Sequence, residues 1–208
     1  MSPSIAYWAV DQIPKRRTLP KVRMRQLTLE GNVCKFELHG SCAVGMGNAI
    51  RRSLMSDVIN YAPKEITIRK NTTCQTDEFI AHRIGMIPFR RVSDDIEGAM
   101  TVNVVGREAM ASDFVGTAYY APTNIPIIKM IDDQELDLDV VFTKGTGNDH
   151  VKFSHVGKVG YKVVTDNHVK VEFEIITDES PLDYLERAID ALSKRLRDTL
   201  CVVESGRQ

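Results

Sequence analysis

Several features that would place the chain in a simple class are missing from its sequence. No stretch reaches about 18 consecutive apolar residues, which excludes a membrane-spanning helix. The first residues carry their apolar patch before their positive charges, which is the reverse of a secretory signal. No C-x-x-C pair occurs among the four cysteines, so neither a disulfide framework nor a zinc knuckle is expected. We therefore expect a soluble intracellular protein.

A surplus of charge is also missing. The chain has 27 Lys and Arg against 28 Asp and Glu, a net charge of −1. Because a protein that binds nucleic acid alone needs excess positive charge on one face, we expect any contact with DNA to be indirect. At ~150 residues per domain, 208 residues predict one domain or a domain with a large insertion.

Motifs for catalysis are absent as well. The Gly-rich piece at residues 144–147 is not followed by G-K-[ST], and no serine lies in G-x-S-x-G. We interpret the five histidines as structural: His39, His82, His150, His155 and His168. One hypothesis for the function is a small-molecule enzyme centred on Lys144, Asp149 and His150, and we rank it third, below the two non-enzymatic functions given at the end of this subsection.

Alternation of apolar and polar residues predicts several strands. A hairpin with one buried face is expected around the turn residues Glu30, Gly31 and Asn32. Its buried face would comprise Val22, Met24, Leu27, Leu29, Cys34, Phe36 and Leu38. Further strands are predicted at residues 66–69, 100–104, 136–142, 161–164 and 169–175.

A spacing of four residues predicts a first long helix. Ser41 would cap it, and it would run to about Ile59 with an apolar stripe of Met46, Ile50, Leu54 and Val58. Gly45 and Gly47 weaken its first turn, which suggests that something packs closely there. A shorter helix is predicted at residues 78–84.

The last predicted helix has the clearest pattern. It starts with Ser180 as cap and Pro181 at the first helical position, and it runs to about Val203. Its apolar residues form a heptad-like seam, namely Leu182, Leu185, Ile189, Leu192, Leu196 and Leu200. Such a seam packs either on the chain's own sheet or on another polypeptide, and the pattern alone does not choose.

Four segments resemble a known family. They read GNAIRRSL at residues 47–54, NTT at 71–73, DEFIAHRIGMIP at 77–88 and KGTGNDHVKF at 144–153. Together they resemble the signature of the alpha-like subunits of multisubunit DNA-directed RNA polymerase, on the eukaryotic and archaeal branch. The resemblance covers residues 21–203 in the family's order.

The resemblance implies an α+β fold with a discontinuous dimerisation domain, a sheet with two packed helices. This domain would comprise residues 21–61 and 165–208, and a mostly β inserted domain would comprise residues 62–164. Residues 1–20 are expected to form an extended tail, and this segment has no counterpart that we can place in the family. Two seam-bearing helices near opposite ends of the chain fit this plan.

The resemblance also implies a role. The chain would be a non-catalytic assembly subunit that pairs with a smaller alpha-like subunit and forms the platform for the second-largest and largest polymerase subunits. Small accessory subunits would be further partners, without a cofactor or catalytic residue. The dimer interface would use Met46, Ile50, Leu54, Leu182, Leu185, Ile189, Leu192 and Leu196. Docking of the large subunits would use Arg51, Arg52, Phe79, Ile80, His82 and Arg83.

The sequence departs from the family in two ways. Many members carry a cysteine cluster for zinc or iron–sulfur in the insert, but residues 75–200 contain no cysteine, so we predict that the chain binds no metal. The insert is also short, as in a compact version of the kind that a large DNA virus encodes, although a streamlined cellular subunit stays open. The compartment would be the nucleus, the cytoplasm or a viral particle or factory accordingly. The alternative function is a free-standing homodimeric binding protein that uses the same seam.

Overall fold

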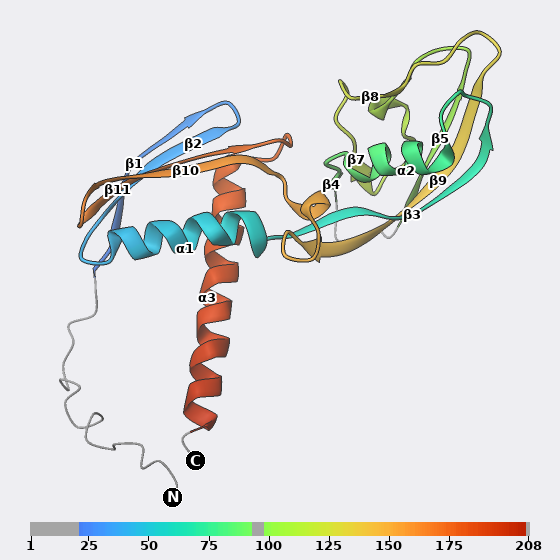
Figure 1. Cartoon of the computed structure of the whole chain (residues 1–208). Coiled ribbons are helices and arrows are strands. Elements are labelled where there is room, and N and C mark those ends of the chain that lie inside the picture. Colours follow the sequence, from blue (N-terminus) through green and yellow to red (C-terminus); the bar gives the residue numbers. More distant parts are fainter. Residues whose placement is uncertain (1–20, 93–97, 207–208) are drawn as a thin grey trace, which may run out of the picture.

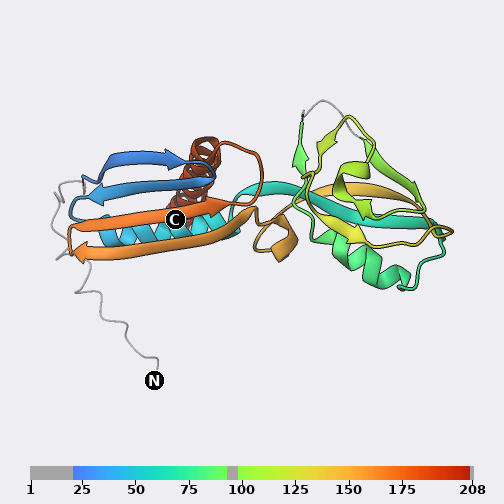
Figure 2. The same cartoon turned by 90° about the horizontal axis from the view of Figure 1, so that it is seen from above.

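A four-stranded antiparallel sheet carries the two long helices on one of its faces (Figures 1 and 2). Its strand order is β1–β2–β11–β10, with bounds Arg23–Glu30, Val33–His39, His168–Ile175 and Val156–Thr165. The computed structural model describes residues 21–92 and 98–206, so the predicted tail at 1–20 lies outside the described residues. Alternate side chains of β2 and β11 are buried, which gives the sheet one apolar face.

The helices α1 (Ala43–Ser56) and α3 (Pro181–Ser205) cover that apolar face. Their common core comprises Cys34, Phe36, Leu38, Ala43, Ile50, Leu54, Val58, Val169, Val171, Phe173, Ile175, Tyr184, Leu185, Ala188 and Leu192. In Figure 1, α3 crosses α1 and then projects beyond it, away from both sheets.

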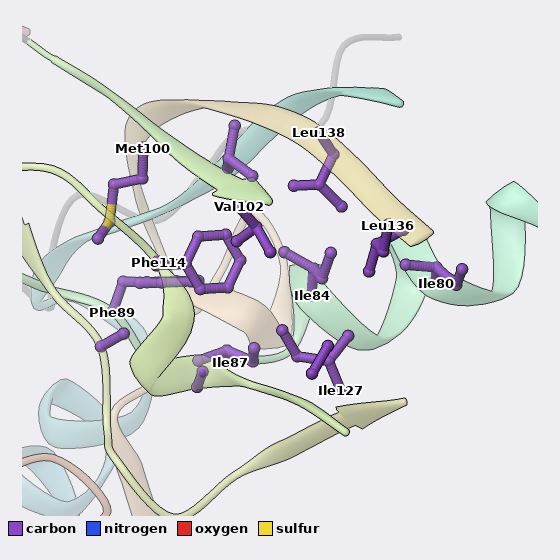
Figure 3. Close-up of a cluster of buried hydrophobic side chains, with 14 of the residues drawn as sticks. Ile80, Ile84, Ile87, Phe89, Met100, Val102, Phe114, Ile127, Leu136 and Leu138 are labelled. Carbon is purple, nitrogen blue, oxygen red and sulfur yellow. The ribbon is translucent and has the colours of Figure 1, made fainter. Parts of the chain in front are cut away.

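A second set of elements surrounds its own core. A three-stranded sheet has the order β3–β9–β5, with bounds Ile59–Asn71, Glu135–Thr146 and Ala99–Val105. The helix α2 (Asp77–Gly85) packs on it, and Figure 3 shows Ile80 and Ile84 of α2 pointing toward Leu136 and Leu138. Short pairs complete this part, namely β4 (Arg90–Arg91) with β7 (Tyr119–Tyr120) and β6 (Ala109–Met110) with β8 (Pro126–Ile128), besides the 3-10 turns η2 (Ala111–Asp113) and η3 (Val151–Phe153).

The prediction of an α+β fold is confirmed, and so is the hairpin around Gly31, which has a φ of 59°. The prediction of a buried face is wrong for β1, because all its residues are exposed. β1 is an edge strand, and the exposed side chains of Met24, Leu27 and Leu29 show that the helices leave it uncovered.

Some predicted boundaries are corrected. α1 begins at Ala43 after Cys42 rather than Ser41, and it ends at Ser56 because Ile59 already starts β3. Ser180 does precede α3, but its side chain makes no capping hydrogen bond. Pro63 lies inside β3, where a shift of register next to it accommodates a residue that has no backbone N–H to donate.

The predicted boundary between the two domains falls inside a strand. β10 begins at Val156 and pairs with β11 in the four-stranded sheet, whereas residues up to 164 were expected in the insert. The hairpin explains this difference, since β10 and β11 form one continuous antiparallel pair. The division into a dimerisation domain and an insert stays a prediction. In the described part of the chain, no helix is long and apolar enough to cross a membrane.

Candidate functional site

The crossing of α1 and α3 is the structural base of the candidate site. Ser53 Oγ of α1 donates a hydrogen bond of 2.7 Å to the backbone oxygen of Ala188 on α3, and both residues are fully buried. Gly47 allows α1 to approach the sheet, because a Cβ there would lie 3.1 Å from Val169 Cγ1. The two helices are therefore held at a fixed crossing point against β11.

A buried polar cluster ties the start of α3 to its neighbours. Asn60 Nδ2 of β3 donates to the Phe153 oxygen at 2.7 Å and to the Tyr184 hydroxyl at 3.2 Å. That hydroxyl in turn donates to the Leu54 oxygen at 3.4 Å. Burial raises the pKa of Tyr184, so the phenol stays protonated and keeps its donor. Buried polar groups that are paired in this way stabilise one relative position of the elements.

Two arginines of α3 fix the direction in which the helix projects. Arg187 Nη2 lies 2.7 Å from both carboxylate oxygens of Glu179, and its Nη1 donates to the Ile59 oxygen at 3.1 Å. About two turns further along α3, Arg195 Nη1 donates to Asp57 Oδ1 at 2.9 Å. These charge-assisted bonds align α3 with the end of α1.

The projecting half of α3 carries an exposed apolar face. Ile189, Leu196, Leu200 and Val203, which we call the α3 strip, follow one another at heptad-like spacing and therefore lie on one side of the helix. Their exposed fractions are 38%, 57%, 58% and 50%. Because burying such surface is favourable, a helix that presents it to water is typical of a binding surface.

The eight residues predicted for a dimer interface divide into two groups. Met46, Ile189 and Leu196 are exposed, and Leu182 is half-buried. The other four are corrected, because their side chains fill the core of this chain and reach no surface: Ile50, Leu54, Leu185 and Leu192. Sequence reasoning left Val203 out of this interface, although the spacing from Leu196 and Leu200 already pointed to it.

The residues predicted for docking of large subunits lie on two separate helices. On α1, Arg51 Nη2 donates to Asn48 Oδ1 at 3.0 Å, while Arg52 is exposed. Since α1 covers the four-stranded sheet and α2 covers the three-stranded one, the two groups do not form one compact site (Figure 1).

On α2, the exposed side chains form a small surface of their own. Phe79 is 44% exposed, and the Arg83 guanidinium lies 5.8 Å from the centre of its ring. Arg83 Nη2 also donates to the Pro126 oxygen at 2.8 Å, while His82 is exposed. The prediction for Ile80 is corrected, because its side chain is fully buried in the core.

The K-G-T-G segment has a structural explanation. A Cβ on Gly145 would lie 2.6 Å from the Phe153 ring, and one on Gly147 would lie 2.0 Å from the Met55 oxygen, so only glycine fits. Asp149 Oδ2 accepts hydrogen bonds from Thr146 N and Oγ1, both at 2.9 Å. The segment connects β9, η3 and the end of α1. It gives no support to an enzyme centred on Lys144, Asp149 and His150.

Comparisons with known proteins agree on one family. The family described as RNA polymerase Rpb3/Rpb11 dimerisation domain matches residues 35–196. The chain is 28% identical to "DNA-directed RNA polymerases II, IV and V subunit 3" of Arabidopsis thaliana, over 80% of this chain and 64% of that protein. It is 27% identical to "DNA-directed RNA polymerase subunit Rpo3" of Methanocaldococcus jannaschii, over 77% of this chain and 86% of that protein. It is 33% identical to "DNA-directed RNA polymerase subunit Rpo3" of Thermococcus kodakarensis, over 61% of this chain and 54% of that protein.

Proposed function

Because the chain belongs to the RNA polymerase Rpb3/Rpb11 dimerisation domain family, we propose that it is a non-catalytic assembly subunit of a DNA-directed RNA polymerase. The names of the relatives support this role, although the chain spans less than two thirds of the Arabidopsis protein. The proposal carries an intracellular location with it.

The proposed partner is a smaller alpha-like subunit, and the α3 strip is the observation that carries this proposal. Its four side chains, together with Met46 on α1, would be covered by helices of the partner. Complete burial of one Leu, Ile, Val or Met side chain contributes about 1.5–3 kcal/mol. The strip is thus large enough to contribute strongly to a stable heterodimer.

The proposed platform function uses the remaining surface. Arg51 and Arg52 on α1, with Phe79, His82 and Arg83 on α2, would contact the second-largest and largest subunits. Arginines set register and association rate across such contacts, and Phe79 supplies an apolar anchor. Small accessory subunits are further proposed partners, and contact with DNA would be indirect.

A charge on the α3 strip tests the proposed pairing. We expect Ile189→Asp and Leu196→Asp to abolish co-purification with the smaller subunit, because an unpaired carboxylate would be buried in the interface. The matched control is Val202→Asp, since Val202 is 70% exposed and lies on the opposite side of α3 from the strip. Unchanged pairing in both strip variants would exclude this surface.

The alternative function, a homodimeric binding protein, uses the same strip. Native mass spectrometry of the chain mixed with a candidate smaller subunit distinguishes the assembly function from the homodimeric one. We expect a heterodimer of one copy each. A homodimer that persists in excess of that subunit would favour the alternative.

A further inference from the structure

Two histidines and a glutamate meet on the outer face of the four-stranded sheet, opposite the helices. The register places His39 of β2 directly across from His168 of β11, and Glu37 lies two residues before His39 on the same face. Glu37 Oε2 is 3.1 Å from His39 Nε2 and 2.9 Å from His168 Nε2. The imidazole rings stack with centroids 4.1 Å apart, so both Nε2 atoms converge on one oxygen.

The carboxylate of Glu37 also pairs with a lysine. Lys170 Nζ lies 2.7 Å from its other oxygen, Oε1. Lys170 thereby orients the carboxylate, as outer groups do around metal ligands. The three side chains are 10%, 34% and 21% exposed, so solvent reaches the group.

We propose that Glu37, His39 and His168 form a binding site for a divalent transition-metal ion of the Zn²⁺ class. Tetrahedral zinc bonds of 2.0–2.2 Å place neighbouring ligand atoms about 3.3 Å apart. The three donor atoms already lie within 4.8 Å of one another, with nitrogen–oxygen separations of 2.9 and 3.1 Å. Three protein ligands leave the fourth position for water or for a side chain of another molecule.

The ligand types favour this class of metal over Mg²⁺ or Ca²⁺. Mg²⁺ and Ca²⁺ need several oxygen ligands, and the site offers a single carboxylate. The cross-strand neighbours are cationic, since Arg23 pairs with His39, Arg25 with Glu37 and Lys162 with Lys170, and they weaken the binding of every divalent ion. Imidazole nitrogen suits Zn²⁺, Ni²⁺ and Cu²⁺.

Such a site would join two ends of the chain. Glu37 and His39 belong to β2 and His168 belongs to β11, so a bound ion would cross-link the central pair of strands and stabilise the sheet. This inference differs from the sequence-based prediction that the chain binds no metal, because that prediction rested on cysteines and on histidines close together in the sequence. It is independent of the proposed function.

Zinc titration of the chelator-treated full chain tests the site. We expect calorimetry to show one Zn²⁺ per chain, with a rise in the unfolding temperature, and Mg²⁺ to give neither. His39→Ala and His168→Ala should each lose this binding. His150→Ala is the matched control, because His150 is exposed and lies outside the cluster, and it should bind like the wild type.

Zinc binding that persists unchanged in both variants, or its absence from the wild type, would overturn the proposal. Circular dichroism of the metal-free variants checks that they fold. Should either alanine variant unfold, His39→Gln and His168→Gln keep a polar side chain of similar size, and the loss of zinc-dependent stabilisation is then read in these.

Discussion

At the residue scale, His155 shows what burial does to a titratable group. The side chain follows η3 and is only 2% exposed, and neither ring nitrogen has a hydrogen-bond partner in the described part of the chain. Burial, and then the positive charge of Arg187, lower the pKa of His155 to about 4. The histidine is therefore neutral in the folded chain at pH 7.

His155 predicts a loss of stability in acid. Its pKa is about 4 when folded and 6.5 when unfolded, so between these values the unfolded chain binds more protons. His155 therefore contributes about 3 kcal/mol to the free energy of unfolding above pH 6.5, and this contribution is lost as the pH falls toward 4. Urea unfolding across this window should show a shallower pH dependence for His155→Leu. The exposed His150→Ala should keep the wild-type slope, and an equal slope in His155→Leu would contradict the assignment.

Individual site residues were predicted unevenly from sequence. Periodicity places both Ile50 and Ile189 on apolar stripes. It does not show that Ile50 is buried in the core while Ile189 stays 38% exposed. The resemblance implied that Ile80 would lie at a docking surface together with Phe79, yet neighbouring helix positions face different directions. Coverage by distant elements decides exposure, and a local pattern contains no information about it.

At the element scale, the two glycines of α1 have different roles. Both suggested close packing from sequence. Gly47 does face Val169 closely, but a Cβ on Gly45 would meet nothing within 4 Å. One glycine thus sets the distance between α1 and the sheet, while the other only weakens the helix.

Substitution of these glycines should therefore have opposite effects. Gly47→Val should lower the free energy of unfolding by about 1–3 kcal/mol, because the added methyl groups overpack against Val169. Gly45→Ala should raise it by up to about 1 kcal/mol through helix propensity. Denaturant unfolding of the two variants measures this difference, and equal destabilisation by both would show that α1 is not seated as described.

Regular elements were predicted well where their pattern was long. The alternation in β9 and β11 and the seam of α3 identify these elements, since one face of each is buried over several turns or residues. The short strands β6, β7 and β8 escaped prediction, because two or three residues contain no measurable period. The strand predicted at residues 66–69 is longer in the structure, because a shift in register keeps Pro63 within β3.

At the scale of the whole molecule, α1 and α2 present arginines from two different layers. Arg51 belongs to the helix pair, and Arg83 belongs to the surface beside β8. A large subunit that contacts both would span the two sheets. The proposed platform is consequently a property of the arrangement of the layers, and no single helix provides it.

Charge reversal on α1 separates the two proposed interfaces. Arg51→Glu should leave the heterodimer intact but weaken capture of the second-largest subunit by about 1–2 kcal/mol, since the charge then repels its partner. Affinity measured with the purified heterodimer checks this. Lys64→Glu, an equal reversal at an exposed position of β3, is the control and should retain normal capture. Equal affinity of Arg51→Glu and wild type would place Arg51 outside the interface.

Long-range pairing was beyond prediction from the residues alone. His39 and His168 become neighbours only because β2 pairs with β11, and nothing in either local pattern specifies that register. The resemblance to a family supplied the idea that the two ends of the chain meet. It did not supply the side chains that face each other where they meet.

The hydrogen bond from Ser53 to Ala188 spans 135 residues, and this separation determines the order in which a ribosome can complete the fold. β1, β2 and α1 are synthesised first, yet β11 and α3, which cover their apolar side chains, are synthesised last. The core around α2 and β9 comes entirely from the intervening chain, so it can form before β11 and α3 are made. The growing chain therefore carries an open apolar layer until β11 and α3 have been made.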